Sequence, residues 1–253
     1  MTALEQHNVE IHSNVEAWRR KPVLQKIYDG FYSRIAAELP PADLGPVIEL
    51  GSGMGNIKRR IPQCITTDIF ENPWLDRREN AYALSFASTS IGAFVLFDVF
   101  HHLRYPGTVL GELHRSLRPG GRVVLFEPDI GLLGRFIYGT FHHEPLGLRD
   151  AITWDAPADF TSASHGYYAA QGNAHRIFVR DERPGSLNGW TLRRVERRPA
   201  LGYVASGGFS GPQLYPGVLL PVFELLDLLA RPLPALFSTR LLVVLEKNVP
   251  RSN

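Results

Sequence analysis

The chain has 253 residues, of which 44% are hydrophobic and 21% charged, a balance typical of one globular α/β domain with an ample core. Its net charge of +2 is too small to indicate a nucleic-acid partner, and its one cysteine, Cys64, excludes an intramolecular disulfide. The first ten residues lack the apolar segment of a signal peptide, and the sequence contains no membrane-spanning run of about 18 apolar residues. We therefore expect a cytoplasmic protein.

The chain opens with a helical region. Apolar residues recur at helical spacing between about residues 14 and 38, and Pro22 interrupts them. Proline is tolerated in the first turn of a helix but not in its interior. The pattern predicts a short turn at residues 15–20 and a longer helix from Pro22, which ends before Pro40-Pro41.

A short apolar strand then runs into a glycine-rich turn over residues 47–56. Gly51, Gly53 and Gly55 stand at alternate positions, where the missing Cβ atoms let a ligand approach backbone N–H groups closely. Dinucleotide-binding turns have the spacing G-x-G-x-x-G, whereas this turn has G-x-G-x-G. Glu49, two residues before the first glycine, suits an ammonium or sulfonium group better than a pyrophosphate.

The elements that follow alternate between strands and helices. A second apolar strand, residues 64–67, ends at Asp68, and an acid at this distance usually meets the ribose hydroxyls of a bound nucleoside. Turn chemistry is concentrated at residues 118–121, Arg-Pro-Gly-Gly. We expect a buried strand, a helix and another strand at residues 93–97, 108–117 and 122–126.

The segment Glu-Leu-Gly-Ser-Gly-Met-Gly, residues 49–55, closely resembles the first motif of class I S-adenosylmethionine-dependent methyltransferases. Further motifs in the expected order extend the resemblance to about residue 129, roughly a third of the chain. The resemblance implies a single α/β domain, residues 1–253, with the Rossmann-like methyltransferase fold: a seven-stranded, mostly parallel sheet with helices on both faces and cap helices at about 14–38. It also implies S-adenosylmethionine as cofactor, bound by Glu49, Gly51, Ser52, Gly53, Gly55, Asp68, Ile69, Asn80, Ala81 and Asp98.

The chain departs from this family at Asn80, where many small-molecule members carry an aspartate before the alanine. An asparagine side chain can still hydrogen-bond the adenine edge, because it carries both a donor and an acceptor.

Residues 130–190 break the strand–helix rhythm, and an insertion at this point lies above the ligand crevice of an open α/β sheet. We expect it to form the wall and lid of an acceptor pocket. A hydroxyl acceptor needs a base, and histidine is the usual one near neutral pH. The candidate bases are His101, His102, His142, His143 and His165, with Asp129 and Asp155 as carboxylate candidates that are more typical of turns or caps. No cluster has convincing metal-ligand spacing, so we predict no metal site.

The last third should complete the sheet with a strand at 190–198 and an antiparallel one at 240–246. Residues 218–230 are strongly apolar, which predicts a core helix or subunit contact or, alternatively, a surface for a membrane or an apolar substrate tail. The arginines between 176 and 198 predict solvated faces and ion pairs, or else an anion site for the acceptor.

On this resemblance we predict methyl transfer to a hydroxyl oxygen of a small molecule, such as a sugar-containing or secondary-metabolite intermediate of bacterial biosynthesis. A homodimer is compatible with the sequence, whereas a nucleic-acid substrate is disfavoured by the low charge and by the lack of an Asn/Asp-Pro-Pro-aromatic motif. Two rivals stay open. One is a protein that binds S-adenosylmethionine without transferring methyl, such as a cyclase or regulatory module, and the other is an NAD-type oxidoreductase.

Overall fold

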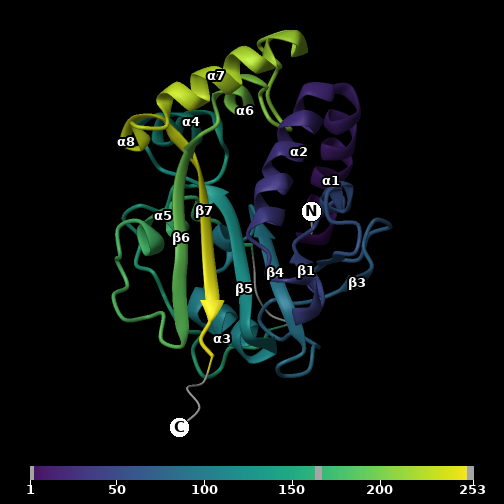
Figure 1. Cartoon of the computed structure of the whole chain (residues 1–253), viewed down its shortest axis with the longest axis vertical. Coiled ribbons are helices and arrows are strands. Elements are labelled where there is room, and N and C mark those ends of the chain that lie inside the picture. Colours follow the sequence, from purple (N-terminus) through teal and green to yellow (C-terminus); the bar gives the residue numbers. More distant parts are fainter. Residues whose placement is uncertain (1–2, 163–166, 250–253) are drawn as a thin grey trace.

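The computed structural model describes residues 3–162 and 167–249 and is built around one seven-stranded sheet (Figure 1). The strand order is β3-β2-β1-β4-β5-β7-β6, and every neighbouring pair is parallel except those that β7 makes with β5 and β6. The α/β class and the mostly parallel sheet predicted from the sequence are therefore confirmed.

Two sets of elements make up this architecture. The strands are β1 (Val47–Leu50), β2 (Ile65–Asp68), β3 (Arg77–Arg78), β4 (Ile91–Phe97), β5 (Leu117–Pro128), β6 (Trp190–Pro199) and β7 (Ser238–Lys247). The α-helices are α1 (Ala3–Arg20), α2 (Pro22–Ala37), α3 (Pro106–Ser116), α4 (Leu132–Phe141), α5 (Asn173–Phe178), α6 (Leu201–Ala205), α7 (Leu220–Ala230) and α8 (Pro234–Phe237). Short 3₁₀ turns are η1 (Ala42–Leu44), η2 (Asn56–Arg59), η3 (Phe100–His102) and η4 (Gly217–Leu219).

Three local expectations need correction. The helix before Pro22 is not a short turn, because α1 runs from Ala3 to Arg20 through polar residues that carry little apolar signal. Strand β3 was not expected, since two arginines give no apolar pattern. The turn at residues 118–121 lies inside β5 as an irregularity: Leu117 pairs with Ile91 but Arg122 pairs with Ala93.

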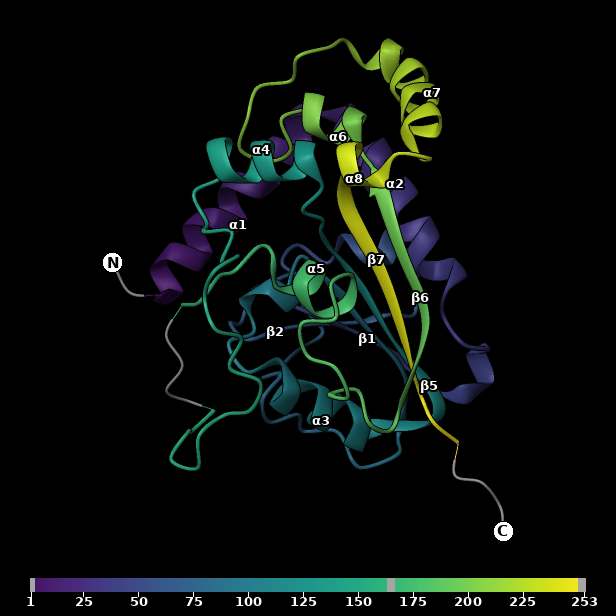
Figure 2. The ribbon, with the colours of Figure 1, turned by 90° about the vertical axis from the view of Figure 1, so that its left-hand side faces the viewer.

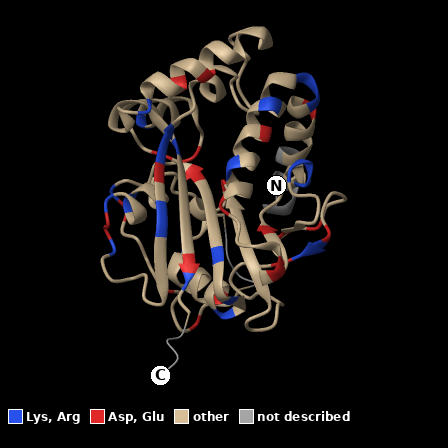
Figure 3. Ribbon diagram, in the orientation of Figure 1, with Lys and Arg blue, Asp and Glu red and all other residues tan. Residues whose placement is uncertain are grey.

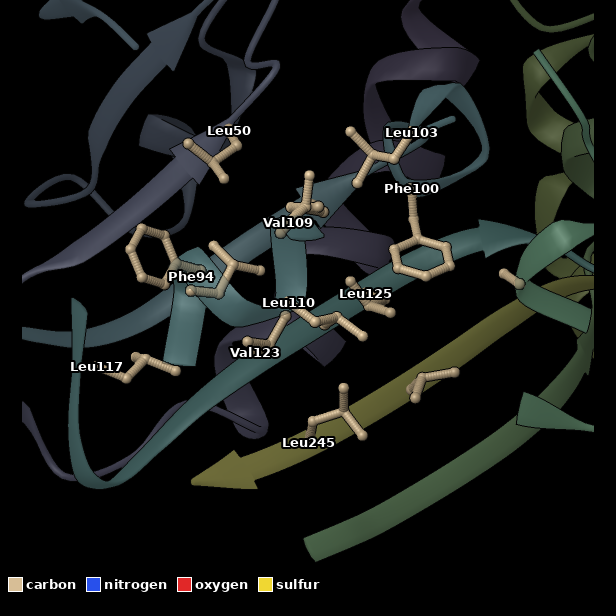
Figure 4. Packing of buried hydrophobic residues seen from close by; sticks show 14 of the residues in the cluster. Leu50, Phe94, Phe100, Leu103, Val109, Leu110, Leu117, Val123, Leu125 and Leu245 are labelled. Carbon is tan, nitrogen blue, oxygen red and sulfur yellow. The ribbon is translucent and has the colours of Figure 1, made fainter. Parts of the chain in front are cut away.

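The core covers both faces of the sheet, because side chains on a strand alternate between them. On β4, Phe94 and Leu96 point into one cluster, with α3 and η3 (Figure 4), whereas Val95 and Phe97 join α2 on the opposite side. Figure 2 shows α2 and α3 on opposite faces of the sheet. This double burial explains the continuous apolar run of β4.

A separate layer of helices, α4, α6, α7 and α8, gathers at the end of the sheet where the parallel strands finish (Figures 1 and 2). The exposed residues of α7 include Leu225, Leu228 and Leu229, at 55%, 56% and 65% exposure. The interpretation of this segment as a core helix is therefore wrong. Within residues 3–162 and 167–249, no helix combines the length and apolar character needed to cross a membrane.

Candidate active site

A cavity of about 750 Å³ lies beneath this helical layer, at the carboxyl ends of β1 and β4. The insertion contributes α4 and the residues after it, as predicted. The region expected to hold the cap helices, α1 and α2, also contributes, and so do residues 203–214, which the sequence did not indicate. The residues that line this cavity are called the wall set and include Tyr32, Glu49, Gly51, Ser52, Gly53, Asp98, His101, His102, Tyr138, Phe141, His142, His143, Glu144, Gln171, Tyr203, Leu214 and Arg240.

Glu49 is a buried acid at the end of β1 that faces this cavity. Its Oε2 atom is buried and has no hydrogen-bond partner in the described part of the chain. Burial raises the pKa of Glu49 to about 8, although hydrogen bonds from Ser52 and Tyr32 oppose the shift. An orphaned carboxylate oxygen at this point fits a cationic ligand group, which would recover the energy lost on burial.

The glycine turn holds an open surface toward the cavity. Gly53 adopts a left-handed φ of 52°, and a Cβ added there would meet no atom within 4 Å. The turn is tied to β2, because Ser52 N donates to the Thr67 carbonyl at 2.8 Å and Gly53 N donates to Asp68 Oδ2 at 3.1 Å. This arrangement leaves room for a ligand over the backbone at Gly53, although the N–H groups of Ser52, Gly53 and Gly55 already donate within the chain.

The residues expected to hold the ribose and adenine lie beside this cavity and outside its wall set. Asp68 is buried at the end of β2, and its second carboxylate oxygen accepts a hydrogen bond from Ile69 N at 2.7 Å. The Asn80 amide donates to the Ser162 carbonyl of the insertion at 2.8 Å, and Asn80 Oδ1 accepts from Tyr82 N at 3.0 Å. Gly55, Ile69 and Ala81 likewise lie outside the wall. The insertion thus contacts the expected adenine side directly.

Asp98, the acid that follows β4, forms an ion pair with Arg240 of β7. Arg240 is only 2% exposed, and its guanidinium carbon lies 4.4 Å from the Tyr203 ring centroid. Burial alone would lower the pKa of Arg240. The opposing effect of nearby groups, led by the charge of Asp98, is larger, so the pKa of Arg240 shifts upward. Arg240 was not predicted from the sequence, where its one signal is a charge at the start of an apolar strand.

His101 and His102 occupy η3, directly after β4, and their ring centroids lie 4.1 Å apart. His101 Nδ1 is 2.7 Å from Glu127 Oε2, while Glu127 Oε1 accepts the backbone N–H groups of Val99 and Phe100. Burial alone would lower the pKa of His101. The larger combined effect of Glu127 and Glu144 raises this pKa, to about 10. The site therefore stabilises positive charge at this point.

Glu144 brings a second carboxylate to the two imidazoles. Its Oε2 lies 3.5 Å from His101 Nε2, and its Oε1 lies 3.5 Å from His102 Nε2. The Gln171 amide and the Tyr167 hydroxyl both donate to Glu144. Burial alone would raise the pKa of Glu144. The hydrogen bond with His101 and the charge of His102 together outweigh this effect, so the pKa of Glu144 shifts downward. No sequence pattern linked this acid to histidines so far away in the chain.

His102 is held from its other side. Its Nδ1 lies 3.0 Å from the Tyr168 carbonyl, which can only accept, so Nδ1 carries the proton and Nε2 keeps a lone pair. Burial, followed by the charge of His101, lowers the pKa of His102.

The remaining candidates are distributed differently. His142 and His143 follow α4 and both border the cavity, with ring centroids 4.9 Å apart. His165 lies outside the described residues. Asp129 is buried away from the wall set, against His175 and Arg197, and Asp155 is exposed.

The arginines of the late strands are dispersed in ion pairs. Arg193, Arg194 and Arg198 of β6 lie near Glu246, Glu38 and Glu196, and Figure 3 shows the row of basic residues along this strand. None of these arginines belongs to the wall set of the cavity, which favours the interpretation as solvated faces and ion pairs.

Residues 48–125 match the family described as methyltransferase domain. Among solved structures, an S-adenosylmethionine-dependent methyltransferase from Thermotoga maritima is 13% identical with a TM-score of 0.53, covering 94% of this chain and 98% of that chain. Another, from Archaeoglobus fulgidus, is 12% identical with a TM-score of 0.51, covering 88% of this chain and 94% of that one. No curated protein matches the chain. The structural likeness supports the fold, and the family match covers the glycine turn and both histidines of η3.

Proposed function

We propose that the chain, which belongs to the class I S-adenosylmethionine-dependent methyltransferases, transfers the methyl group to a hydroxyl oxygen of a small-molecule acceptor. One observation carries the proposal: the cavity that holds Glu49 and the glycine turn is also lined by His101, His102 and Glu144. Such a site would hold a cationic group and a proton acceptor side by side in one cavity. We also propose that residues 1–253 act as one domain, with a biosynthetic role in the cytoplasm.

S-adenosylmethionine supplies a methyl group already activated on a positively charged sulfur, so positioning accounts for much of the rate. For this positioning we assign the charged methionine portion to Glu49 and the ribose hydroxyls to Asp68, with the open turn at Gly53 between them. Asn80 would reach the adenine only by giving up its bond to the Ser162 carbonyl.

Loss of the acceptor proton is assigned to the histidine side of the cavity. The tautomer of His102 leaves its Nε2 lone pair free, and the side chain is 33% exposed, so an acceptor hydroxyl can reach it. His143 borders the same space and is a second candidate for receiving the proton. The helical layer above the cavity limits access of water, which otherwise competes as methyl acceptor.

An acceptor with an apolar tail suits the cavity rim. Phe141 and Leu214 border the cavity and are 71% and 74% exposed. The exposed apolar side chains of α4 and α7 lie in the same helical layer. We propose that this layer meets a membrane surface that presents the acceptor, with a homodimer through α7 as the competing outcome.

Calorimetric titration with S-adenosylmethionine and S-adenosylhomocysteine, followed by an acceptor screen that begins with sugars and phenols, tests the proposal. We expect binding of both ligands and formation of S-adenosylhomocysteine with a hydroxyl acceptor. The variant His102→Ala should lower turnover while cofactor affinity stays the same. Cofactor binding without S-adenosylhomocysteine formation across the screen would instead favour the rival that does not transfer methyl.

A further inference from the structure

We propose that His101, His102 and Glu144 bind a divalent transition-metal ion in the wall of the cavity. The role of this ion in catalysis rests on the proposed function, but its binding does not. One nitrogen from each imidazole and one carboxylate oxygen lie within 4.8 Å of one another. The prediction of no metal site from the sequence rested on ligand spacing along the chain, whereas these ligands come from two distant segments.

The separations between the ligand atoms suit a common ion. His101 Nε2 lies 3.5 Å from Glu144 Oε2, and His102 Nε2 lies 3.5 Å from the other oxygen, Oε1, so both carboxylate oxygens face the ion. Nitrogen and oxygen ligands sit about 2.0–2.2 Å from Zn²⁺, and two of them at a tetrahedral angle are then about 3.4 Å apart. An ion would therefore fit between the three side chains once the Gln171 amide turns aside, because its Nε2 lies 3.4 Å from His101 Nε2 and also donates to Glu144.

Both imidazoles carry the outer partners that metal-binding histidines usually have. Such a histidine donates its other ring N–H to a carboxylate or a backbone carbonyl, which fixes the tautomer and directs the remaining nitrogen at the metal. His101 Nδ1 faces Glu127 at 2.7 Å, and His102 Nδ1 faces the Tyr168 carbonyl at 3.0 Å. The Tyr167 hydroxyl orients Glu144 in the same way, at 2.5 Å from Oε1.

His142 does not join this set. Its Nδ1 accepts the backbone N–H of Glu144 at 3.3 Å, which occupies the lone pair nearest the carboxylate. Three protein ligands therefore remain, and all three border the cavity, so a further coordination position would face the space reserved for the acceptor. Three protein ligands with an open position are typical of catalytic rather than structural metal sites.

The donor set also narrows the identity of the ion. Two imidazole nitrogens and one carboxylate suit Zn²⁺, Fe²⁺ or Co²⁺, whereas Mg²⁺ and Ca²⁺ prefer oxygen ligands. An ion at this position would coordinate the acceptor hydroxyl and lower its pKa. Because the ion then occupies the Nε2 lone pair of His102, His143 would receive the acceptor's proton instead. The acceptor class favoured by such a site is a hydroxyl with a neighbouring oxygen, such as a vicinal diol or catechol, which can bind the ion through both atoms.

The test measures metal binding without acceptor or cofactor. The purified chain, stripped with a chelator, is titrated with Zn²⁺ at pH 8, and with Co²⁺ to record the visible absorption of bound Co²⁺. We expect one ion per chain, binding at least about tenfold weaker in His102→Ala and Glu144→Gln, and about tenfold weaker in Tyr167→Phe, which loses an outer partner. The matched control His143→Ala, a histidine on the same wall outside the ligand set, should bind the ion like the native chain.

Each outcome decides between the metal site and an ion-paired cluster in which Glu127 and Glu144 hold a protonated His101. No uptake by the native chain, or equal uptake by His102→Ala and the native chain, would overturn the metal site. Calorimetry with S-adenosylmethionine on the same samples shows that each variant is folded. It also separates the two proposals, because a chain that binds the cofactor but no metal keeps the proposed function and loses only the ion.

Discussion

Cofactor affinity should rise with pH because of Glu49. The free protein keeps this buried side chain protonated up to about pH 8, whereas a positively charged ligand group favours the carboxylate. Binding therefore removes a proton, and the proton's competition weakens binding below the pKa. For a pKa of about 8, affinity should rise about tenfold from pH 6 to pH 7 and about fivefold from pH 7 to pH 8, then level off.

The assay is calorimetric titration with S-adenosylmethionine from pH 6 to pH 9, in buffers of different ionisation heat that count the protons released. The ligand's own α-amino group titrates near pH 8 and works in the opposite direction. The variant Glu49→Gln isolates that contribution, because glutamine keeps the size of the side chain but does not titrate. A profile for the native chain that parallels the Glu49→Gln profile would refute the assignment of the cation to this carboxylate.

The same variant has a second consequence, for stability. The pKa of Glu49 rises on folding from an ordinary value of 4.5 to about 8. Between these pH values the unfolded chain releases a proton that the folded chain retains, so stability falls as pH rises from about 4.5 to 8 and then levels off. Glu49→Gln removes this loss and should raise the melting temperature at pH 8 but not at pH 4. A lower melting temperature at both pH values would indicate that the glutamine amide disturbs β1 instead.

Three further substitutions test other parts of the site and surface. Asp68→Ala should weaken cofactor binding by at least about tenfold, because it removes the assigned ribose partner and the acceptor for the Gly53 N–H. An unchanged calorimetric affinity would argue against that assignment. Arg240→Met leaves the Asp98 carboxylate without its buried partner and should cost about 3 kcal/mol in urea unfolding, with a smaller loss in Arg240→Lys. Leu225→Ser combined with Leu229→Ser changes exposed positions, so stability should shift by less than about 0.5 kcal/mol while cosedimentation with anionic vesicles is lost. A dimer-to-monomer change in gel filtration, with vesicle binding intact, would assign α7 to a subunit contact.

The sequence predicted the region around the glycine turn well, because its signals are local. An apolar strand, alternate glycines and a later acid lie within about twenty residues, and β1, the turn and β2 are adjacent in space as they are in the chain. The hydrogen bond from Gly53 N to Asp68 joins the two motifs that the sequence had identified separately. Local periodicity also located β4, α3 and β5 for the same reason.

The sequence predicted that the insertion contributes to the cavity wall, but not which side chains meet there, because these contacts join segments that are far apart in the chain. Glu144 directly follows two histidines that were candidate bases, but the side chains it faces are those of His101 and His102. The Tyr168 carbonyl that fixes the tautomer of His102 is a backbone group, and every residue type has one, so the sequence cannot identify it. For α7 the sequence left a core helix and an exposed apolar surface as alternatives, because an apolar composition does not distinguish between them.

The acids at the ends of β1 and β4 show how packing separates residues that the sequence treats alike. Glu49 lies near the end of β1 and Asp98 directly after β4, and both were expected to contact the cofactor. In the fold, the buried Arg240 neutralises Asp98, whereas Glu49 retains an unpartnered oxygen within the described residues. A cationic ligand group gains more beside Glu49, because a carboxylate already paired with a guanidinium offers little further attraction. The proposed position of the cofactor's charged end therefore depends on Arg240 of β7, which is far from both acids in the sequence.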